Sequence, residues 1–243
     1  MNDKRTLALG TWISVGAPPI TEMASGMGFD WLLFDLEHGF MQESDLLANM
    51  QAVEGGVKVI VRMGDFRPGF IARVLDWGAD GIMMPHVSNA AYAKAIVNAM
   101  RYPPFGNRGF SSSSRSFGYG KSAPKETPPH ESPLLLAQIE NYEGVMNVSE
   151  IAAVEGVDLL FIGPRDLSLD LSVTQGAMPY DHAVAMVVTA AANARKQVGI
   201  LLSPQEDAAA ARAAGFDCLA IGSDMSVLRA GYNNIITNHK TIK

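Results

Sequence analysis

Eight short apolar runs, distributed along almost the whole chain, constrain the fold more than any other feature of this sequence. Most are continuous rather than alternating, which is typical of parallel strands buried on both faces. Segments with helical spacing lie between them, for example residues 90–100, 183–197 and 205–214. The eight runs are residues 7–13, 31–34, 57–61, 81–84, 134–139, 159–162, 198–202 and 218–221. Eight strand and helix units in succession predict an α/β fold, a (β/α)8 TIM barrel.

A small repeated pattern before the strands supports this prediction. Several helix-like segments end in Gly, then an apolar residue or Ala, then Asp, and glycine suits the left-handed end of a helix. The pattern recurs at residues 27–30, 77–80, 154–158 and 214–217. A doubly wound open sheet is the alternative, but no Gly-x-Gly-x-x-Gly follows the first run. We expect residues 1–243 to form one domain, with a long loop at about 102–133 and a polar C-terminal tail.

The composition argues against nucleic-acid and membrane partners. The chain has 243 residues and a formal net charge of −6, and no stretch gathers Lys and Arg into a basic stripe. Phosphate binding depends on such clusters, so we expect no nucleic acid partner. No run approaches the roughly 20 apolar residues of a membrane span, and residues 1–5 lead into a strand-like run without a signal region. We expect a soluble, cytoplasmic protein without a membrane partner.

Polar residues gather where the predicted strands end. The carboxyl ends of the strands build the active site in barrels of this kind, so these residues are the candidates for chemistry. In chain order they are Asp35, Glu37, His38, Arg62, His86, Gln138, Glu140, Asp166, Ser203, Ser223 and Asp224.

Glu140 and Asp166 are the candidate metal ligands among them. Each carboxylate follows an apolar strand, and the two strands are consecutive, so we expect them to be neighbours. Two oxygen ligands with open positions suit Mg²⁺, Mn²⁺ or a similar divalent ion that accepts a chelating substrate. The alternative is that Asp166 only caps the helix that follows it and that Glu140 pairs with an arginine.

His38 and Arg62 are the candidate proton-transfer and charge-stabilising groups. An imidazole oriented by a carboxylate can act as a general base, and Asp35 and Glu37 flank His38. Arg62 offers a fixed positive charge among carboxylates, as needed to stabilise a developing enolate. A structural histidine, and a structural ion pair for Arg62, are the alternatives. We interpret Glu37 as a structural partner rather than a metal ligand.

Covalent catalysis is disfavoured by the placement of the nucleophiles. Cys218 is the only cysteine, and its apolar run predicts a buried, inert thiol. A Schiff-base aldolase needs a desolvated lysine at the substrate carbonyl. No lysine ends a predicted strand, and only Lys121 and Lys125 lie in a loop that could approach. Activation of a carbonyl by a metal is therefore favoured over imine formation.

The predicted loop at residues 102–133 is rich in Pro, Gly and Ser. Loops of this length in a compact domain are usually functional or disordered. Because it precedes a strand, we expect it to begin on the N-terminal side of the barrel and to reach a catalytic rim only in a neighbouring subunit. Arg108 and Arg115 could neutralise an acid group of the substrate, but we interpret them as solvated loop charges.

Several motifs in the right order resemble those of one known family. They are residues 28–38, 61–62, 101–109, 138–140 and 163–168, and the resemblance extends over about residues 9–229. By these motifs the chain resembles the HpcH/HpaI aldolases, a family of class II, metal-dependent pyruvate aldolases. The family includes 4-hydroxy-2-oxo-heptanedioate aldolase and 2-dehydro-3-deoxyglucarate aldolase.

The resemblance implies a role for each candidate in binding metal and substrate. Glu140 and Asp166 would ligate a divalent cation (Mg²⁺, Mn²⁺ or Co²⁺), with Gln138 supporting the metal site. Arg62 would hold the keto oxygen and stabilise the enolate. The substrate carboxylate would bind backbone N–H groups around Arg165 and Asp166, next to Pro164, at a helix N-terminus. Arg165 stands where many relatives have a small residue, so the substrate of any one relative is a weak guide.

The resemblance also implies the proton-transfer group and the assembly. His38 would be the base, with Asp35 and Asp76 orienting it. Many relatives are hexamers, trimers of dimers with active sites at subunit interfaces, so we expect a homo-oligomer in which residues 232–243 serve packing between subunits.

The predicted reaction is a reversible aldol cleavage. A 4-hydroxy-2-oxo acid would give pyruvate, or a related 2-oxo acid such as hydroxypyruvate, and an aldehyde, in the catabolism of aromatic compounds or sugar acids. Two alternatives remain: an acyl-CoA hydroxy-acid lyase of the citrate lyase type, and a non-catalytic barrel that binds a carboxylate.

Overall fold

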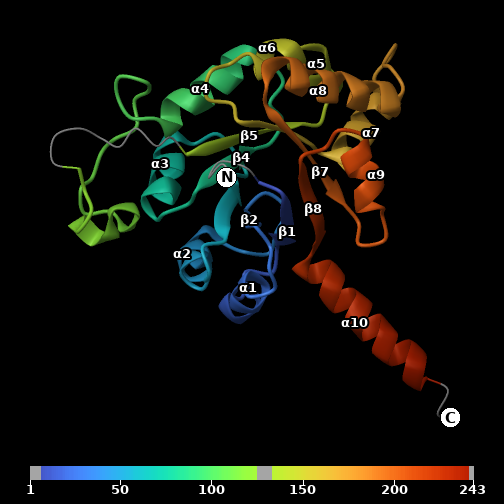
Figure 1. The fold of residues 1–243 in the computed structure, drawn as a ribbon, viewed down its shortest axis with the longest axis horizontal. Helices are drawn as coiled ribbons and strands as arrows, with labels where there is room; N and C mark the ends of the chain where they lie inside the picture. Colours follow the sequence, from blue (N-terminus) through green and yellow to red (C-terminus); the bar gives the residue numbers. More distant parts are fainter. Residues whose placement is uncertain (1–6, 125–132, 241–243) are drawn as a thin grey trace.

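The chain folds into a closed barrel of eight parallel strands, as the sequence predicts (Figure 1). The computed structural model describes residues 7–124 and 133–240. Each strand is hydrogen-bonded to the next, and the last pairs with the first. The strands are β1 (Leu9–Ile13), β2 (Trp31–Asp35), β3 (Lys58–Arg62), β4 (Gly81–Met84), β5 (Leu134–Ile139), β6 (Leu159–Ile162), β7 (Gln197–Leu202) and β8 (Cys218–Ser223).

Helices on the outside of the barrel connect the strands. The prediction of a helix at residues 90–100 is confirmed by α4, whereas the later helices start and end a few residues from their predicted limits. The helices are α1 (Pro18–Ser25), α2 (Glu43–Gln51), α3 (Pro68–Asp76), α4 (Ala90–Met100), the 3₁₀ helix η1 (Arg115–Gly120), α5 (Tyr142–Met146), α6 (Val148–Ala152), α7 (Pro164–Val173), α8 (Tyr180–Ala194), α9 (Ala208–Ala213) and α10 (Asp224–His239).

Most of the segment expected to be a polar tail belongs to a helix. α10 runs to His239 and projects away from the barrel (Figure 1). Its start is fixed by Ser223 and Ser226, whose side chains each accept a hydrogen bond from the other's backbone N–H in a capping box. Asn233 and Asn234 have low helix propensity, so the sequence did not predict a helix in this segment. Residues 241–243 lie outside the described part of the chain.

Aromatic residues fill the interior of the barrel. The rings of Trp12 and Trp31 pack against Phe161 with centroid distances of 5.5 and 6.3 Å. Gly10 makes room for this packing, because a Cβ there would lie 2.3 Å from the Trp31 ring. Cys218 is fully buried in this inner cluster, and burial raises the pKa of its thiol. The predicted burial is confirmed, and the raised pKa fits an unreactive thiol.

The long loop begins on the N-terminal side of the barrel, as expected. Arg108 donates a 2.6 Å hydrogen bond to Asp76 at the end of α3, and Arg115 donates one of 2.6 Å to the carbonyl of Trp77. Arg108 is only 7% exposed and stacks on the Tyr102 ring. The interpretation of Arg108 as a solvated charge is therefore wrong: a carboxylate and an aromatic face compensate its burial. Residues 125–132 of the loop lie outside the described part.

None of the helices in residues 7–124 and 133–240 is both long and apolar enough to cross a bilayer.

Candidate active site

A large pocket opens at the carboxyl ends of the barrel strands. Its volume is about 1400 Å³, and the aromatic ring of Trp12 forms part of its wall. Most of the residues selected from the sequence contribute to its lining. The predicted site residues on its wall are Asp35, His38, Arg62, Gln138, Pro164, Arg165 and Asp166.

Asp35 and Arg62 form a buried ion pair across two neighbouring strands. They are partners in the register of β2 with β3, so their side chains leave the sheet side by side. Arg62 donates to the two carboxylate oxygens of Asp35 with Nε and Nη2, at 2.9 and 2.8 Å. Asp35 also accepts the backbone N–H groups of Glu37 and His38, both at 3.1 Å. This carboxylate therefore fixes both the guanidinium and the turn that carries His38.

The remaining side of the Arg62 guanidinium faces Glu37. Nη1 lies 2.7 Å from Glu37 Oε2, and the guanidinium carbon lies 5.6 Å from the centre of the Trp12 ring. Burial alone would lower the pKa of Arg62, but its hydrogen bond to Asp35 and the charges of Asp35, Glu37 and Glu140 raise it. Arg62 is thus a permanent, oriented cation at the wall of the pocket.

Glu140, just beyond β5, is a buried carboxylate without a full counter-charge. Its Oε1 accepts the backbone N–H of His86 at 2.8 Å, and its Oε2 accepts the amide N–H of Gln138. Burial raises its pKa to about 7, helped by the charges of Glu37 and Asp166 and opposed by the His86 hydrogen bond. A bound cation would remove this penalty, because it favours the ionised carboxylate.

Gly163 and the start of α7 close the pocket beside Glu140. A Cβ on Gly163 would lie 2.4 Å from Glu140 Oε2, so a larger residue there would displace the Glu140 carboxylate. Pro164 occupies the first turn of α7, and Asp166 follows it in the same turn. Free backbone N–H groups at such a helix start favour an anion. The Arg165 side chain is exposed at the pocket wall.

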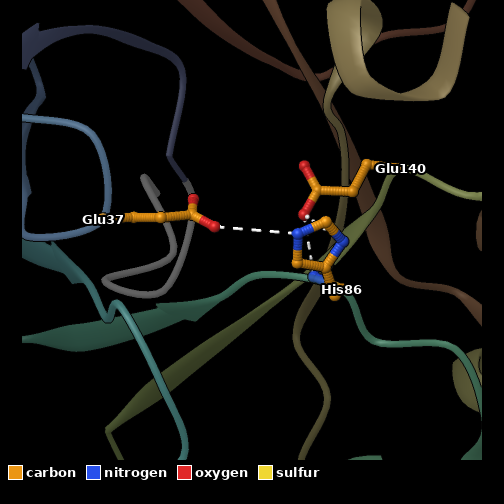
Figure 2. A group of neighbouring side chains, drawn as sticks. All are labelled: Glu37, His86 and Glu140. Carbon is orange, nitrogen blue, oxygen red and sulfur yellow. Dashed lines mark hydrogen bonds and ion pairs between the residues drawn. The ribbon is translucent and has the colours of Figure 1, made fainter. Parts of the chain in front are cut away.

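His86 is a residue to which the sequence analysis gave no role. It follows β4 in the left-handed region, with φ of 52°, which is uncommon for a residue with a side chain. Its imidazole lies between two carboxylates, with Nδ1 3.3 Å from Glu140 Oε1 and Nε2 3.8 Å from Glu37 Oε1 (Figure 2). Its position after a strand was a signal, but the backbone conformation that aims it at Glu140 has no sequence signature.

Asp35 and Asp76 were predicted to orient His38, and within one protomer the structure places only Asp35 beside it. Asp35 binds the backbone of His38, while the imidazole is mostly exposed and lies 3.9 Å from Glu37 Oε2. Asp76 ends α3, and a helix that follows a barrel strand ends at the opposite rim. Within one protomer, Asp76 pairs with Arg108 and is not brought to His38.

The donor atoms around Glu140 fit a divalent cation. Among the described residues, Gln138 Oε1 is a buried oxygen without a hydrogen-bond partner. The same Gln138 side chain donates a hydrogen bond to Glu140, a buried carboxylate without a full counter-charge. Carboxylate and amide oxygens are the ligands that Mg²⁺ and Mn²⁺ prefer.

Comparison with known proteins shows the family of this chain. A family model described as HpcH/HpaI aldolase/citrate lyase matches residues 8–230. The chain belongs to this family. The crystal structure of an HpcH/HpaI aldolase/citrate lyase family protein from Burkholderia cenocepacia J2315 superposes on this chain with a TM-score of 0.86. It is 28% identical, with 97% of this chain and 95% of that chain covered.

Two relatives in the HpcH/HpaI family have names that state an activity. One is a 2-dehydro-3,6-dideoxy-6-sulfogluconate aldolase of Pseudomonas putida, 33% identical over 97% of this chain and 94% of its own. The other, a 5-keto-4-deoxy-D-glucarate aldolase of Shigella dysenteriae, is 34% identical over 97% and 93%. The prediction of a carbon–carbon lyase is confirmed, and the aldolase prediction is favoured over the acyl-CoA lyase and the non-catalytic barrel.

Proposed function

We propose that this protein cleaves 4-hydroxy-2-oxo acids by a retro-aldol reaction, to pyruvate or a related 2-oxo acid such as hydroxypyruvate and an aldehyde. The observation that carries the proposal is the buried Arg62, held by Asp35 and Glu37 at the pocket wall beside Glu140. Such a cation stabilises negative charge that develops on a substrate oxygen.

The substrate would bind between Arg62 and the start of α7. Its carboxylate would accept hydrogen bonds from the backbone around Arg165 and Asp166, since the helix start favours an anion. The 2-oxo oxygen would then face the guanidinium of Arg62. In this orientation the bond between C3 and C4 is the one that breaks, and its electron pair becomes the enolate that Arg62 stabilises.

His38 would take the proton from the C4 hydroxyl, which drives the release of the aldehyde. The proton taken up by His38 is then returned to C3 of the enolate, which gives the 2-oxo acid and restores the base. Asp35 contributes by holding the turn that carries His38. The orienting role predicted for Asp76 requires a second protomer, because α3 ends at the opposite rim of its own barrel.

Glu140 and Asp166 would hold the divalent cation, with Gln138 supporting the site. When bound, Mg²⁺, Mn²⁺ or Co²⁺ would act as a Lewis acid on the 2-oxo acid unit.

Removal of the metal should abolish turnover. We expect EDTA to reduce the cleavage of a simple 4-hydroxy-2-oxo acid to background, and Mg²⁺, Mn²⁺ or Co²⁺ to restore it, with pyruvate release as the assay. Borohydride added with substrate should not inactivate the enzyme, because no lysine would form an imine. Activity that survives EDTA and is trapped by borohydride would contradict the proposal.

The aldehyde partner is proposed only by class. The names of both relatives point to sugar-derived acids with a second anionic group, and Arg165 adds a cation to the pocket wall. A panel of aldehydes, tested with pyruvate and with hydroxypyruvate while the metal is varied, would define the preference.

A homo-oligomer, by resemblance a hexamer built as a trimer of dimers, is the proposed assembly. α10 projects from the barrel with large apolar side chains in the open, a feature of interaction sites. Leu228, Tyr232, Ile235 and Ile236 recur at helical spacing on one side of it. A cytoplasmic location stays a prediction.

A charge on this side of α10 should dissociate the oligomer. We expect the wild type to elute as a hexamer in size exclusion with light scattering, and Ile235→Asp/Ile236→Asp to elute as smaller species, because an interface core excludes unpaired charge. Thr237→Asp, on the opposite side of the helix from Ile235, is the matched control. A monomeric wild type, or an unchanged double variant, would refute this role of α10.

A further inference from the structure

A cluster of three possible ligands shares Glu140 with the proposed metal pair, and its histidine, His86, has no role in the mechanism above. Glu37, His86 and Glu140 each offer one donor atom, and the three atoms lie within 4.8 Å of one another. They come from three different strand ends, after β2, β4 and β5. Figure 2 shows the imidazole of His86 between the two carboxylates. Asp166 is not a member of this group among the described residues.

We propose that Glu37, His86 and Glu140 form a second cation position, which takes a transition-metal ion such as Mn²⁺, Co²⁺ or Zn²⁺ and shares Glu140 with Asp166. The proposal rests on the proposed function in that Glu140 is also assigned to the catalytic cation. A cation in this cluster would lie on the His86 side of Glu140.

The geometry of the cluster is close to that of a bound ion. Ligands on opposite sides of an ion with bonds of 2.0–2.2 Å lie about 4.2 Å apart, so a spread of 4.8 Å requires only small movements. The two glutamates are fixed: their side chains are 10% and 1% exposed. The imidazole is 60% exposed and can rotate. His86 is not part of the pocket wall, so an ion can enter from solvent without crossing the substrate site.

The charge around the cluster favours a cation. Asp35 neutralises Arg62 through two hydrogen bonds. Glu37 still contacts Arg62 with Oε2, but its Oε1 is turned toward His86. Glu140 contributes a second carboxylate that is almost fully buried. The carboxylates of Glu37 and Glu140 therefore face the imidazole of His86, and little positive charge nearby is left to balance them.

The ligand set determines which metal is preferred. Carboxylates alone suit Mg²⁺ and Mn²⁺, whereas an imidazole shifts the preference toward Zn²⁺, Co²⁺ and other transition metals. Mg²⁺ should accordingly favour Glu140 with Asp166, and the transition metals should also occupy the cluster with His86.

The direct test is the electron spin echo spectrum of Mn²⁺ bound to the full-length, metal-free protein. We expect coupling to an imidazole nitrogen in the wild type and its loss in His86→Asn. Asparagine tolerates the left-handed backbone of this position, so the variant should fold. His182→Asn, an exposed histidine of α8, is the matched control and should keep the coupling. In equilibrium dialysis, His86→Asn should weaken Co²⁺ binding by ~10–100-fold and leave Mg²⁺ binding unchanged.

A further variant separates this inference from the proposed function. Asp166→Asn should lose retro-aldol activity and still show the nitrogen coupling, because Asp166 is outside the cluster. A wild-type spectrum without nitrogen coupling, or one unchanged in His86→Asn, would overturn the second position while leaving the aldolase proposal intact. Activity that needs no metal would instead overturn the aldolase proposal, whatever the spectrum shows.

Discussion

Arg62→Lys should lower kcat/KM for retro-aldol cleavage by at least ~10²–10³-fold, the usual cost of one lost donor to a developing oxyanion. Lysine keeps the charge but cannot reproduce the paired hydrogen bonds to Asp35 and the simultaneous contact with Glu37. Its ammonium group would move toward one carboxylate and away from the substrate oxygen. An assay that couples the release of pyruvate to its reduction measures kcat/KM for the wild type and the variant.

Loss of the guanidinium should also affect stability. Removing one partner of a buried ion pair typically costs about 3–5 kcal/mol, so Arg62→Ala should lower the free energy of unfolding by an amount of this order. Arg67→Lys is the control, because Arg67 is half exposed and pairs with Glu43 and Asp65 on the surface. Surface pairs contribute about 0–1 kcal/mol.

For the activity prediction, an Arg62→Lys enzyme that keeps more than about a tenth of the wild-type kcat/KM would show that Arg62 is only structural.

Glu140→Gln should abolish activity and remove the pH dependence that this residue gives to the stability of the metal-free protein. Burial raises the pKa of Glu140 from 4.5 to about 7. Between these values the folded state keeps a proton that the unfolded state has lost, so the free energy of unfolding falls as pH rises. The contribution is fully present below pH 4.5 and lost above pH 7, and is worth about 3 kcal/mol.

Urea unfolding of metal-free protein at pH 5 and pH 8 measures this effect. Glu140→Gln should match the wild type at pH 5 and be more stable at pH 8, since glutamine stays neutral. Its new N–H group can donate to the unpartnered oxygen of Gln138. Metal should stabilise the wild type at pH 8 but not the variant. Glu143→Gln, an exposed residue of α5, is the control. A variant that still gains stability from metal would show that Glu140 is not a ligand.

The sequence predicts which residues belong to this site better than it predicts the contacts among them. Asp35, Arg62 and Glu140 each follow an apolar run that predicts a buried strand, so a barrel places them at one rim. The pairing of Arg62 with both Asp35 and Glu37 depends on strand register, which the sequence alone does not specify.

Positions determined by the direction of helices and by single backbone angles were harder to predict. Asp76 was assigned to His38 by resemblance, but α3 carries it to the other rim of its own barrel. His86 points at Glu140 only because its φ is 52°. Arg108 was expected in solvent because it lies in a loop, and its burial against Tyr102 and Asp76 is a tertiary effect.

The ion pair between Asp35 and Arg62 also has a consequence for how the chain reaches its native state. The two residues are opposite each other in the register of β2 with β3. A slip of one residue between parallel strands turns every side chain of one strand to the other face. Arg62 would then lie in the apolar layer beneath the helices, without a counter-ion, at a cost of several kcal/mol. The charges that handle the substrate therefore also reject misaligned barrels during folding, and a variant that neutralises both should misfold more often even where its native state is stable.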